Sequence, residues 1–147
     1  MALKLGMQAK LYYKTGGVAA AGAWTELGNI KDLTLSLETG EADVTTRANA
    51  GWRATVGTLK EGSVEFEMVW NTGDPGFTAI KNAFFSNAAI GLAIMDGDIA
   101  TAGTQGLQAD FSITTFSRNE ALEEAITVSV TAKPTYSTSA PTWAVIP

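Results

Sequence analysis

Large apolar residues alternate with polar ones along two segments of the chain, and an alternation with period two predicts half-buried β-strands. Between Asp32 and Glu38 every second residue is leucine, and between Ser63 and Trp70 every even-numbered residue is large and apolar. Further strands are expected at residues 8–14, 24–27, 41–47, 90–95, 107–116 and 125–133. Thr39-Gly40 is expected to turn the chain between two of them.

One segment in the middle of the chain predicts a helix instead. Asp74 is a good N-cap, and Pro75 suits the first helical position. Phe77 is followed by apolar residues three and seven positions later, which places all three on one face of a helix. We expect this helix at about residues 75–87.

The order of these elements predicts a mainly β fold for a single domain at residues 1–133. We expect a small β-sandwich or partly closed barrel with the helix packed on one flank. A long inter-strand loop is expected at about residues 48–60, where no regular apolar period is present. Residues 134–147 contain three of the four prolines and are expected to form a C-terminal arm outside the core.

Composition narrows the chemistry that this domain can perform. The 147 residues include no cysteine and no histidine, which excludes disulfides and thiolate nucleophiles and removes the usual general acid–base group. Asp96-Gly97-Asp98 is better read as a turn than as a calcium loop. The adjacent Glu123 and Glu124 point apart in a strand and make a poor catalytic pair. We therefore expect no enzyme activity, no cofactor and no metal site.

Charge and hydropathy limit the partners. The net charge is −5 and no basic block is present, which argues against tight binding of nucleic acid through its phosphates. The first ten residues lack the apolar run of a secretory signal, and the longest apolar run, residues 88–95, is too short to span a membrane. We expect a soluble protein inside a cell, without membrane association.

The polar faces of the predicted strands are rich in hydroxyl groups and, until Lys133, carry only negative charge. They comprise Thr34, Ser36 and Glu38, then Ser63, Glu65 and Glu67, then Gln108, Asp110, Ser112 and Thr114, and finally Thr127, Ser129 and Thr131. An ordinary solvated face mixes lysine with glutamate. Chance in a small sample is one explanation. The other is a surface that a polyanion can slide past without sticking.

The run from Trp24 to Asp74 and the element order after it resemble a known family. A Trp-Thr-Glu-Leu-Gly-Asn-Ile-Lys-Asp-Leu-Thr-Leu segment leads into a strand, and an arginine-bearing loop, residues 46–58, follows. A strand that begins at Gly62 then ends in Trp-Asn-Thr-Gly-Asp before the predicted helix. This arrangement resembles the tail tube (major tail) proteins of long-tailed bacteriophages and prophages, which are similar in fold to the tube proteins of contractile tails and of type VI secretion.

The resemblance implies a structural subunit that assembles as hexameric rings stacked into a hollow tube, whose acidic lumen conducts DNA without binding it specifically. It implies an inter-subunit loop role for Arg47, Trp52 and Arg53. It also implies lumen-facing positions for acidic residues of the strand faces, and the candidates are Glu38, Glu65, Glu67 and Asp110. The implied partners are the tape-measure, tail-terminator and tail-tip proteins. The implied location is the virion tail, assembled in the bacterial host cytoplasm.

Two other classes of function compete with this interpretation. A carbohydrate- or protein-binding β-sandwich module could use the four tryptophans as stacking surface, although Trp70 lies on the apolar side of its strand and is expected in the core. An enzyme is the weakest alternative, because the chain lacks histidine and cysteine. For Trp52, packing onto the core of its own chain is the alternative to an interface role.

Overall fold

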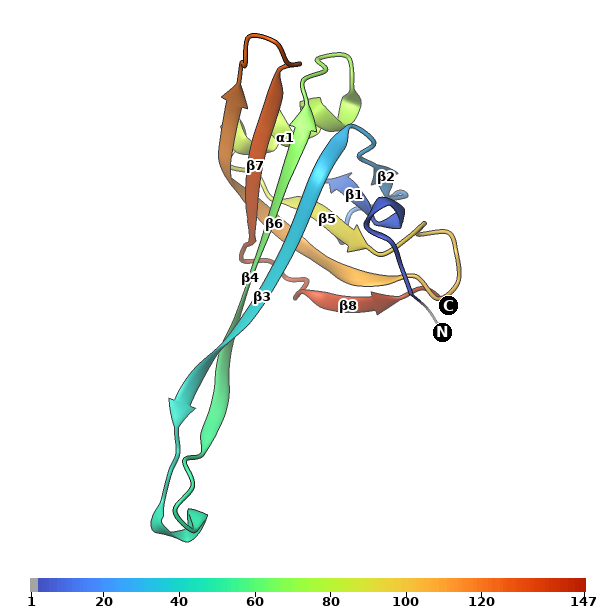
Figure 1. Ribbon diagram of the computed structural model, residues 1–147. Helices are drawn as coiled ribbons and strands as arrows, with labels where there is room; N and C mark the ends of the chain where they lie inside the picture. The colour runs from blue at the N-terminus through green and yellow to red at the C-terminus, as the bar shows by residue number, and fades with distance from the viewer. Residues whose placement is uncertain (1–2) are drawn as a thin grey trace.

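A single antiparallel sheet of eight strands curls into a half-barrel around one helix in the computed structural model, which describes residues 3–147 (Figure 1). The neighbour order of the strands is β2-β1-β5-β6-β7-β4-β3, and β8 pairs with β6. The strands are β1 (Lys10–Thr15), β2 (Thr25–Glu26), β3 (Ile30–Asp43), β4 (Thr55–Val69), β5 (Ile90–Met95), β6 (Gln105–Asn119), β7 (Thr127–Pro134) and β8 (Thr142–Val145), and the helix is α1 (Pro75–Ser86). The mainly β class with one flanking helix is confirmed.

The long strand β6 joins two parts of the sheet. From Gly106 to Phe111 it pairs with β5, and from Phe111 to Asn119 it pairs with β7. The register with β7 shifts between Ile113 and Thr115. Such a bulge bends a strand and increases its twist, which fits the curl of the sheet at this point.

The main core lies inside the curl, where α1 covers the apolar face of the sheet. The predicted alternation on β4 is confirmed, because Val64, Phe66 and Met68 are all buried. Phe77 of the helix is buried as well, and the ring of Trp70 meets it edge to face at a centroid distance of 4.7 Å. Trp70 therefore packs against the core, as its position in the strand predicts.

Both ends of α1 follow from local sequence. The side chain of Asp74 accepts a hydrogen bond from the Gly76 N–H at 3.3 Å, which satisfies one of the free donors at the helix start. Asn87 ends the helix in a left-handed conformation with φ of 55°. A Cβ at position 76 would collide with the side chain of Leu27, so this glycine allows the helix start to pack closely on the sheet.

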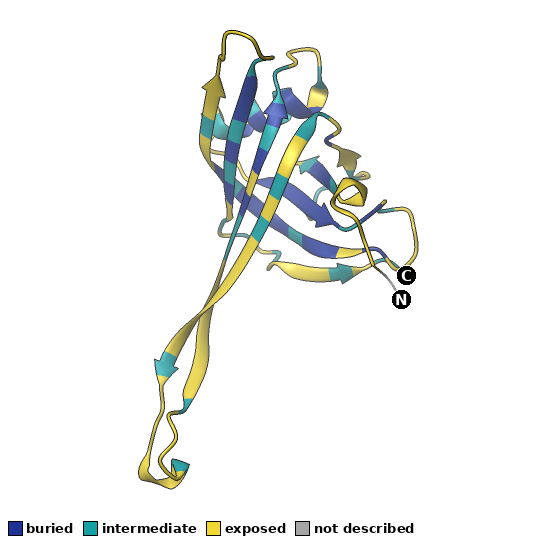
Figure 2. Ribbon diagram, in the orientation of Figure 1, coloured by how far each residue is buried: buried dark blue, intermediate teal, exposed yellow. Residues whose placement is uncertain are grey.

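The β3–β4 hairpin extends far beyond the body, and we call its protruding part, residues 37–62, the arm (Figure 1). From Val64 onward β4 lies between β3 and β7, but before Val64 it pairs with β3 alone. None of the residues in the arm is buried (Figure 2).

The arm corrects two predictions. The connecting segment is shorter than the loop expected at 48–60, since β3 ends at Asp43 and β4 begins at Thr55. Gly40 does not turn the chain but lies at a β-bulge, between the pairs Thr39–Lys60 and Glu41–Gly57. The physical reason is the same in both cases. Neither face of this hairpin is buried in the chain, so its strands need no apolar period.

The C-terminal segment returns to the body. Strand β8 pairs with the start of β6, and the Ile146 N–H donates to the Thr104 carbonyl oxygen at 2.9 Å. Ile146 also packs on a small second cluster that contains Tyr12 and Met95, on the sheet face opposite the main core. No helix among residues 3–147 is long and apolar enough to cross a membrane.

Candidate functional site

A polar face runs across β3, β4, β7 and the second half of β6, on the side away from the main core. Directly paired residues of an antiparallel sheet share a face, so the register defines its rows. One row consists of Thr34, Glu65, Thr131 and Thr115. A second row consists of Glu67, Ser129 and Ser117. Glu65 is thus flanked by hydroxyl groups on both neighbouring strands, and Glu67 has one beside it on β7, as the period-two pattern indicates.

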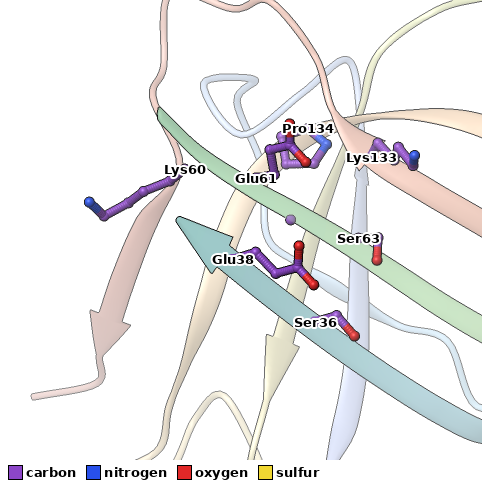
Figure 3. Close-up of a pocket in the computed structure, with 8 residues that line it drawn as sticks. Ser36, Glu38, Lys60, Glu61, Ser63, Lys133 and Pro134 are labelled. Carbon is purple, nitrogen blue, oxygen red and sulfur yellow. The ribbon is translucent and has the colours of Figure 1, made fainter. Parts of the chain in front are cut away.

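Nearer the arm, Glu38 and Glu61 lie directly opposite each other across β3 and β4. Like charges at such a pair repel and destabilise the pairing slightly. They line a groove of about 430 Å³, together with residues that include Lys60 and Lys133 (Figure 3). Within residues 3–147 neither glutamate forms an ion pair, since the two salt bridges of this region involve other residues. The polar face therefore carries carboxylates that are not neutralised by direct contacts.

Asp110 is placed differently from the other predicted lumen residues. It is only 6% exposed. One carboxylate oxygen accepts a hydrogen bond from the Val18 N–H at 2.6 Å, and the other accepts one from the Ser137 hydroxyl. Two chain segments, one after β1 and one after β7, thus cover this part of β6. Asp110 acts in the chain as a structural latch and does not present an exposed carboxylate.

The tip of the arm, residues 44–54, is held in a defined shape by local hydrogen bonds. The Thr45 hydroxyl accepts from the Ala54 N–H at 2.9 Å, and the Asp43 carboxylate accepts from the Thr45 N–H at 2.8 Å. Hydrogen bonding from the Thr45 side chain, and then from the Thr45 backbone, lowers the pKa of the Asp43 carboxyl, because it favours the charged form. A left-handed residue, Ala50, and Gly51 close the turn.

The three predicted loop residues all lie on this tip. Trp52 is 78% exposed, so it does not pack onto the core of its own chain. Arg47 and Arg53 are exposed beside it, and neither forms a salt bridge within the part of the chain that is described. An aromatic side chain with two arginines is typical of the anchors of protein interfaces.

Within residues 3–147, two stretches of open strand edge lie in the part of the sheet that carries the polar face, in addition to the outer edges of β2 and β8. Within residues 3–147, β3 pairs with β4 only, so its outer edge has no partner strand. From Ser112 to Asn119, β6 pairs with β7 on one side and with no strand on the other. These open edges bound the four-stranded region that carries the polar face, one on each side.

Sequence reasoning missed Glu61 on the polar face. It could have been found by continuing the alternation of Ser63, Glu65 and Glu67 one step upstream. The open edges could not have been found this way, because they depend on which strands pair.

Two of the other tryptophans, Trp24 and Trp70, are partly covered and offer little stacking surface, whereas Trp143 is 57% exposed. Lys14 lies over the ring of Trp24 at 4.8 Å, and Arg118 lies over that of Trp70 at 5.0 Å. Among the described residues, no group of three or more acidic side chains lies close enough together to hold a metal ion.

Comparison with known proteins identifies the family of the chain. The sequence profile of the phage tail tube protein family matches residues 9–135. No curated protein sequence matches.

Several solved structures share the fold at low sequence identity. One of these chains comes from the tail of an empty gene transfer agent particle, whose structure was obtained by helical refinement with C6 symmetry. It matches this chain with a TM-score of 0.76 at 16% sequence identity. The match covers 97% of this chain and 100% of that one. The SPP1 tail tube protein has a TM-score of 0.71 and 16% identity over 89% of this chain and 75% of that one. A chain of the anti-feeding prophage baseplate has a TM-score of 0.65 and 7% identity over 99% and 98%.

The profile match spans most of the chain, from before β1 to the end of β7. The same region contains the curled sheet, the flanking helix and the arm. The chain therefore belongs to the phage tail tube protein family and is a structural component of the virion tail.

Proposed function

We propose that six copies of this protein close into a ring, and that the rings stack into a hollow tube through which DNA passes. The observation that carries the proposal is the pair of open edges, on β3 and on residues 112–119 of β6, at the two sides of one four-stranded region. Unpaired strand edges invite pairing with another chain. If β3 of one copy pairs with β6 of the next, a ring leaves neither edge open.

Such a ring joins the four-stranded regions into one continuous barrel. The main core and α1 lie on one side of this region, so the polar face is the side free to line the bore. Each copy then contributes Glu38, Glu65 and Glu67 to the bore. Asp110 is left out, because its carboxylate is covered within the chain.

An acidic bore suits passage without binding. DNA carries one negative charge per roughly 1.7 Å of its axis, so a basic wall would hold it by releasing counterions. At physiological salt, repulsion from a carboxylate reaches only about 8 Å. The wall therefore prevents adhesion without blocking transit, and the hydroxyl groups beside Glu65 and Glu67 keep it wettable.

The arm supplies the second kind of contact between copies in this proposal. Arg47, Trp52 and Arg53 are exposed in the single chain, and contact with another copy would bury them. The assembly takes place in the host cytoplasm, with the tape-measure, tail-terminator and tail-tip proteins as further partners. The subunit has no enzymatic role in it.

Electron microscopy of the purified protein at high concentration tests the assembly directly. We expect class averages with six-fold rings, or tubes built from them. Averages that contain only isolated subunits at every concentration would contradict the proposal.

The bore is tested by reversing its charge. Tails built with Glu65→Lys and Glu67→Lys should keep their morphology, because both side chains lie on the face away from the core, but they should deliver DNA more slowly or not at all. The matched control replaces the same two residues with glutamine, which removes the charge without creating a basic wall, and should deliver DNA nearly normally. Normal delivery by normal tubes of the lysine variant would show that these carboxylates do not act on DNA.

A further inference from the structure

We propose that the arm tip of one copy docks on the β6–β7 turn, residues 120–126, of the next copy along the tube. The inference rests on the proposed stacking of copies and names the surface that receives the arm. Two observations support it. The charges and apolar side chains of the arm tip complement those of the β6–β7 turn, and the two surfaces lie at opposite ends of the molecule.

The arm tip presents an aromatic ring beside two positive charges. Trp52 is the anchor, and Arg47 and Arg53 flank it with no carboxylate partner among residues 3–147. The hydrogen bonds between Thr45 and the backbone of Ala54 hold the base of the tip together. The tip is therefore preorganised for binding, which reduces the entropy lost on docking.

The β6–β7 turn presents the opposite charge beside an apolar side chain. Leu122 is 100% exposed, the highest exposure among the large apolar residues of 3–147. Glu123 and Glu124 follow it, and both are exposed without a salt bridge in the described residues. The nearby cation Arg118 is already engaged, since it lies 2.9 Å from the Glu120 carboxylate and stacks over Trp70. The turn thus offers one apolar contact and two free negative charges.

These two surfaces lie at opposite ends of the molecule (Figure 1). The arm points away from one end of the body, and the β6–β7 turn lies at the other end. A shift of one copy along the direction of β4 therefore brings the tip of its arm toward the turn of another. From Gly62 to Thr55 the extended strand reaches about 25 Å, at roughly 3.4 Å per residue. A head-to-tail contact of this kind does not close on itself and generates an open stack.

The groove beside Glu38 and Glu61 is the competing acidic surface for the arm tip. Lys60 and Lys133 also line that groove, and they would repel Arg47 and Arg53. The groove also belongs to the polar face, which an arm seated there would cover. The β6–β7 turn has neither disadvantage, so it is the better receptor.

Cysteine cross-linking tests the contact, because the natural chain contains no cysteine. Chains with Ala48→Cys, at an exposed position of the arm tip, are mixed with chains with Ala121→Cys, at an exposed position of the turn, so that Trp52 and Leu122 stay in place. After assembly and oxidation we expect a disulfide-linked dimer of one chain of each kind. The matched control pairs Ala48→Cys with Tyr136→Cys, which is 94% exposed but lies outside the turn, and should give no dimer. Tubes that contain no dimer of the Ala48→Cys and Ala121→Cys chains, or a dimer with the control alone, would overturn the inference.

Charge exchange gives a second test that does not depend on cysteine. The variant Arg47→Glu with Arg53→Glu should reduce the fraction of protein that sediments as tubes on the order of tenfold, because it places like charges against the turn. The variant Glu123→Arg with Glu124→Arg should do the same. Neither double variant should form tubes efficiently by itself, whereas a chain that carries all four changes should form tubes again.

The two tests separate this inference from the function on which it rests. Suppose that wild-type protein forms tubes, whereas the chain with all four charge changes forms none although its thermal unfolding is unchanged. The arm then docks elsewhere and the inference is wrong. If wild-type protein forms no rings or tubes, the proposed function fails and this inference fails with it.

Discussion

Strand β4 passes through two environments, and its side chains show how different they are. In the body Phe66 is 4% exposed and packs in the main core, whereas in the arm Leu59 is 81% exposed. In both places the backbone pairs with β3. The hydrogen-bonded ladder is therefore shared by both environments, and burial by tertiary contacts is confined to one of them.

The difference indicates where the single chain leaves apolar side chains exposed. An isolated two-stranded hairpin is marginally stable in water. The arm nevertheless extends with exposed Leu37, Val56 and Leu59 and with Trp52 at its tip. Exposed apolar groups gathered on one element are typical of interaction sites. The body is stabilised by contacts within the chain, whereas the arm is left exposed and available for the contact between copies that we propose.

The largest effect on stability is expected in the body. Phe66→Ala should lower the free energy of unfolding by about 3–5 kcal/mol, because it removes a buried ring and leaves a cavity. Chemical denaturation measures this directly. A loss below about 1 kcal/mol would mean that the core does not depend on this part of β4. Side chains of β4 in the body would then contribute no more to the free energy of unfolding than those in the arm.

An intermediate effect is expected at the Asp110 latch. Asp110→Ala leaves the Val18 N–H and the Ser137 hydroxyl without their acceptor, which should cost about 1–3 kcal/mol. Asp110→Asn keeps one acceptor oxygen and should lose less. Hydrogen exchange should show faster exchange at Val18 in the alanine variant, and unchanged exchange there would contradict the latch.

The smallest effect on stability is expected in the arm. Leu59→Ala should change the free energy of unfolding by less than about 0.5 kcal/mol, since its side chain is already in solvent. The same change should weaken assembly, as measured by sedimentation of tubes. A clear fall in the melting temperature of the isolated subunit would show that the arm folds back on the body and that its side chains are buried there.

Sequence patterns predicted those elements in which one face is buried. The alternation from Val64 to Met68 and the stripe that begins at Phe77 both report a face in contact with the core, and both were correct. The two strands of the arm carry no such signal, because both of their faces are exposed. Gly40 consequently read as a turn, although it occupies a bulge within a continuous hairpin.

The candidate site was predictable to a similar degree. Glu65 and Glu67 follow from alternation along a single strand, so their shared face could be read from the sequence. The burial of Asp110 could not, since Val18 and Ser137, which cover it, are distant in sequence. Strand β8 was missed because it is only four residues long and none of them is buried.

The neighbour order of the strands determines which strand pairs can form early in folding, and therefore when each open edge forms. Strands β3 and β4 are consecutive and can zip up locally, so the β3 edge forms early. Strands β6 and β7 are consecutive as well, so the β6 edge also forms by local pairing. The distant pairing is that of β4 with β7, where Phe66 pairs with Val130. Pairings between distant segments are slow, on a scale of roughly milliseconds to seconds. A newly made chain thus forms the two hairpins first and joins them last, by pairing β4 with β7. We expect ring growth to begin from fully folded subunits, after a lag set by this slowest pairing.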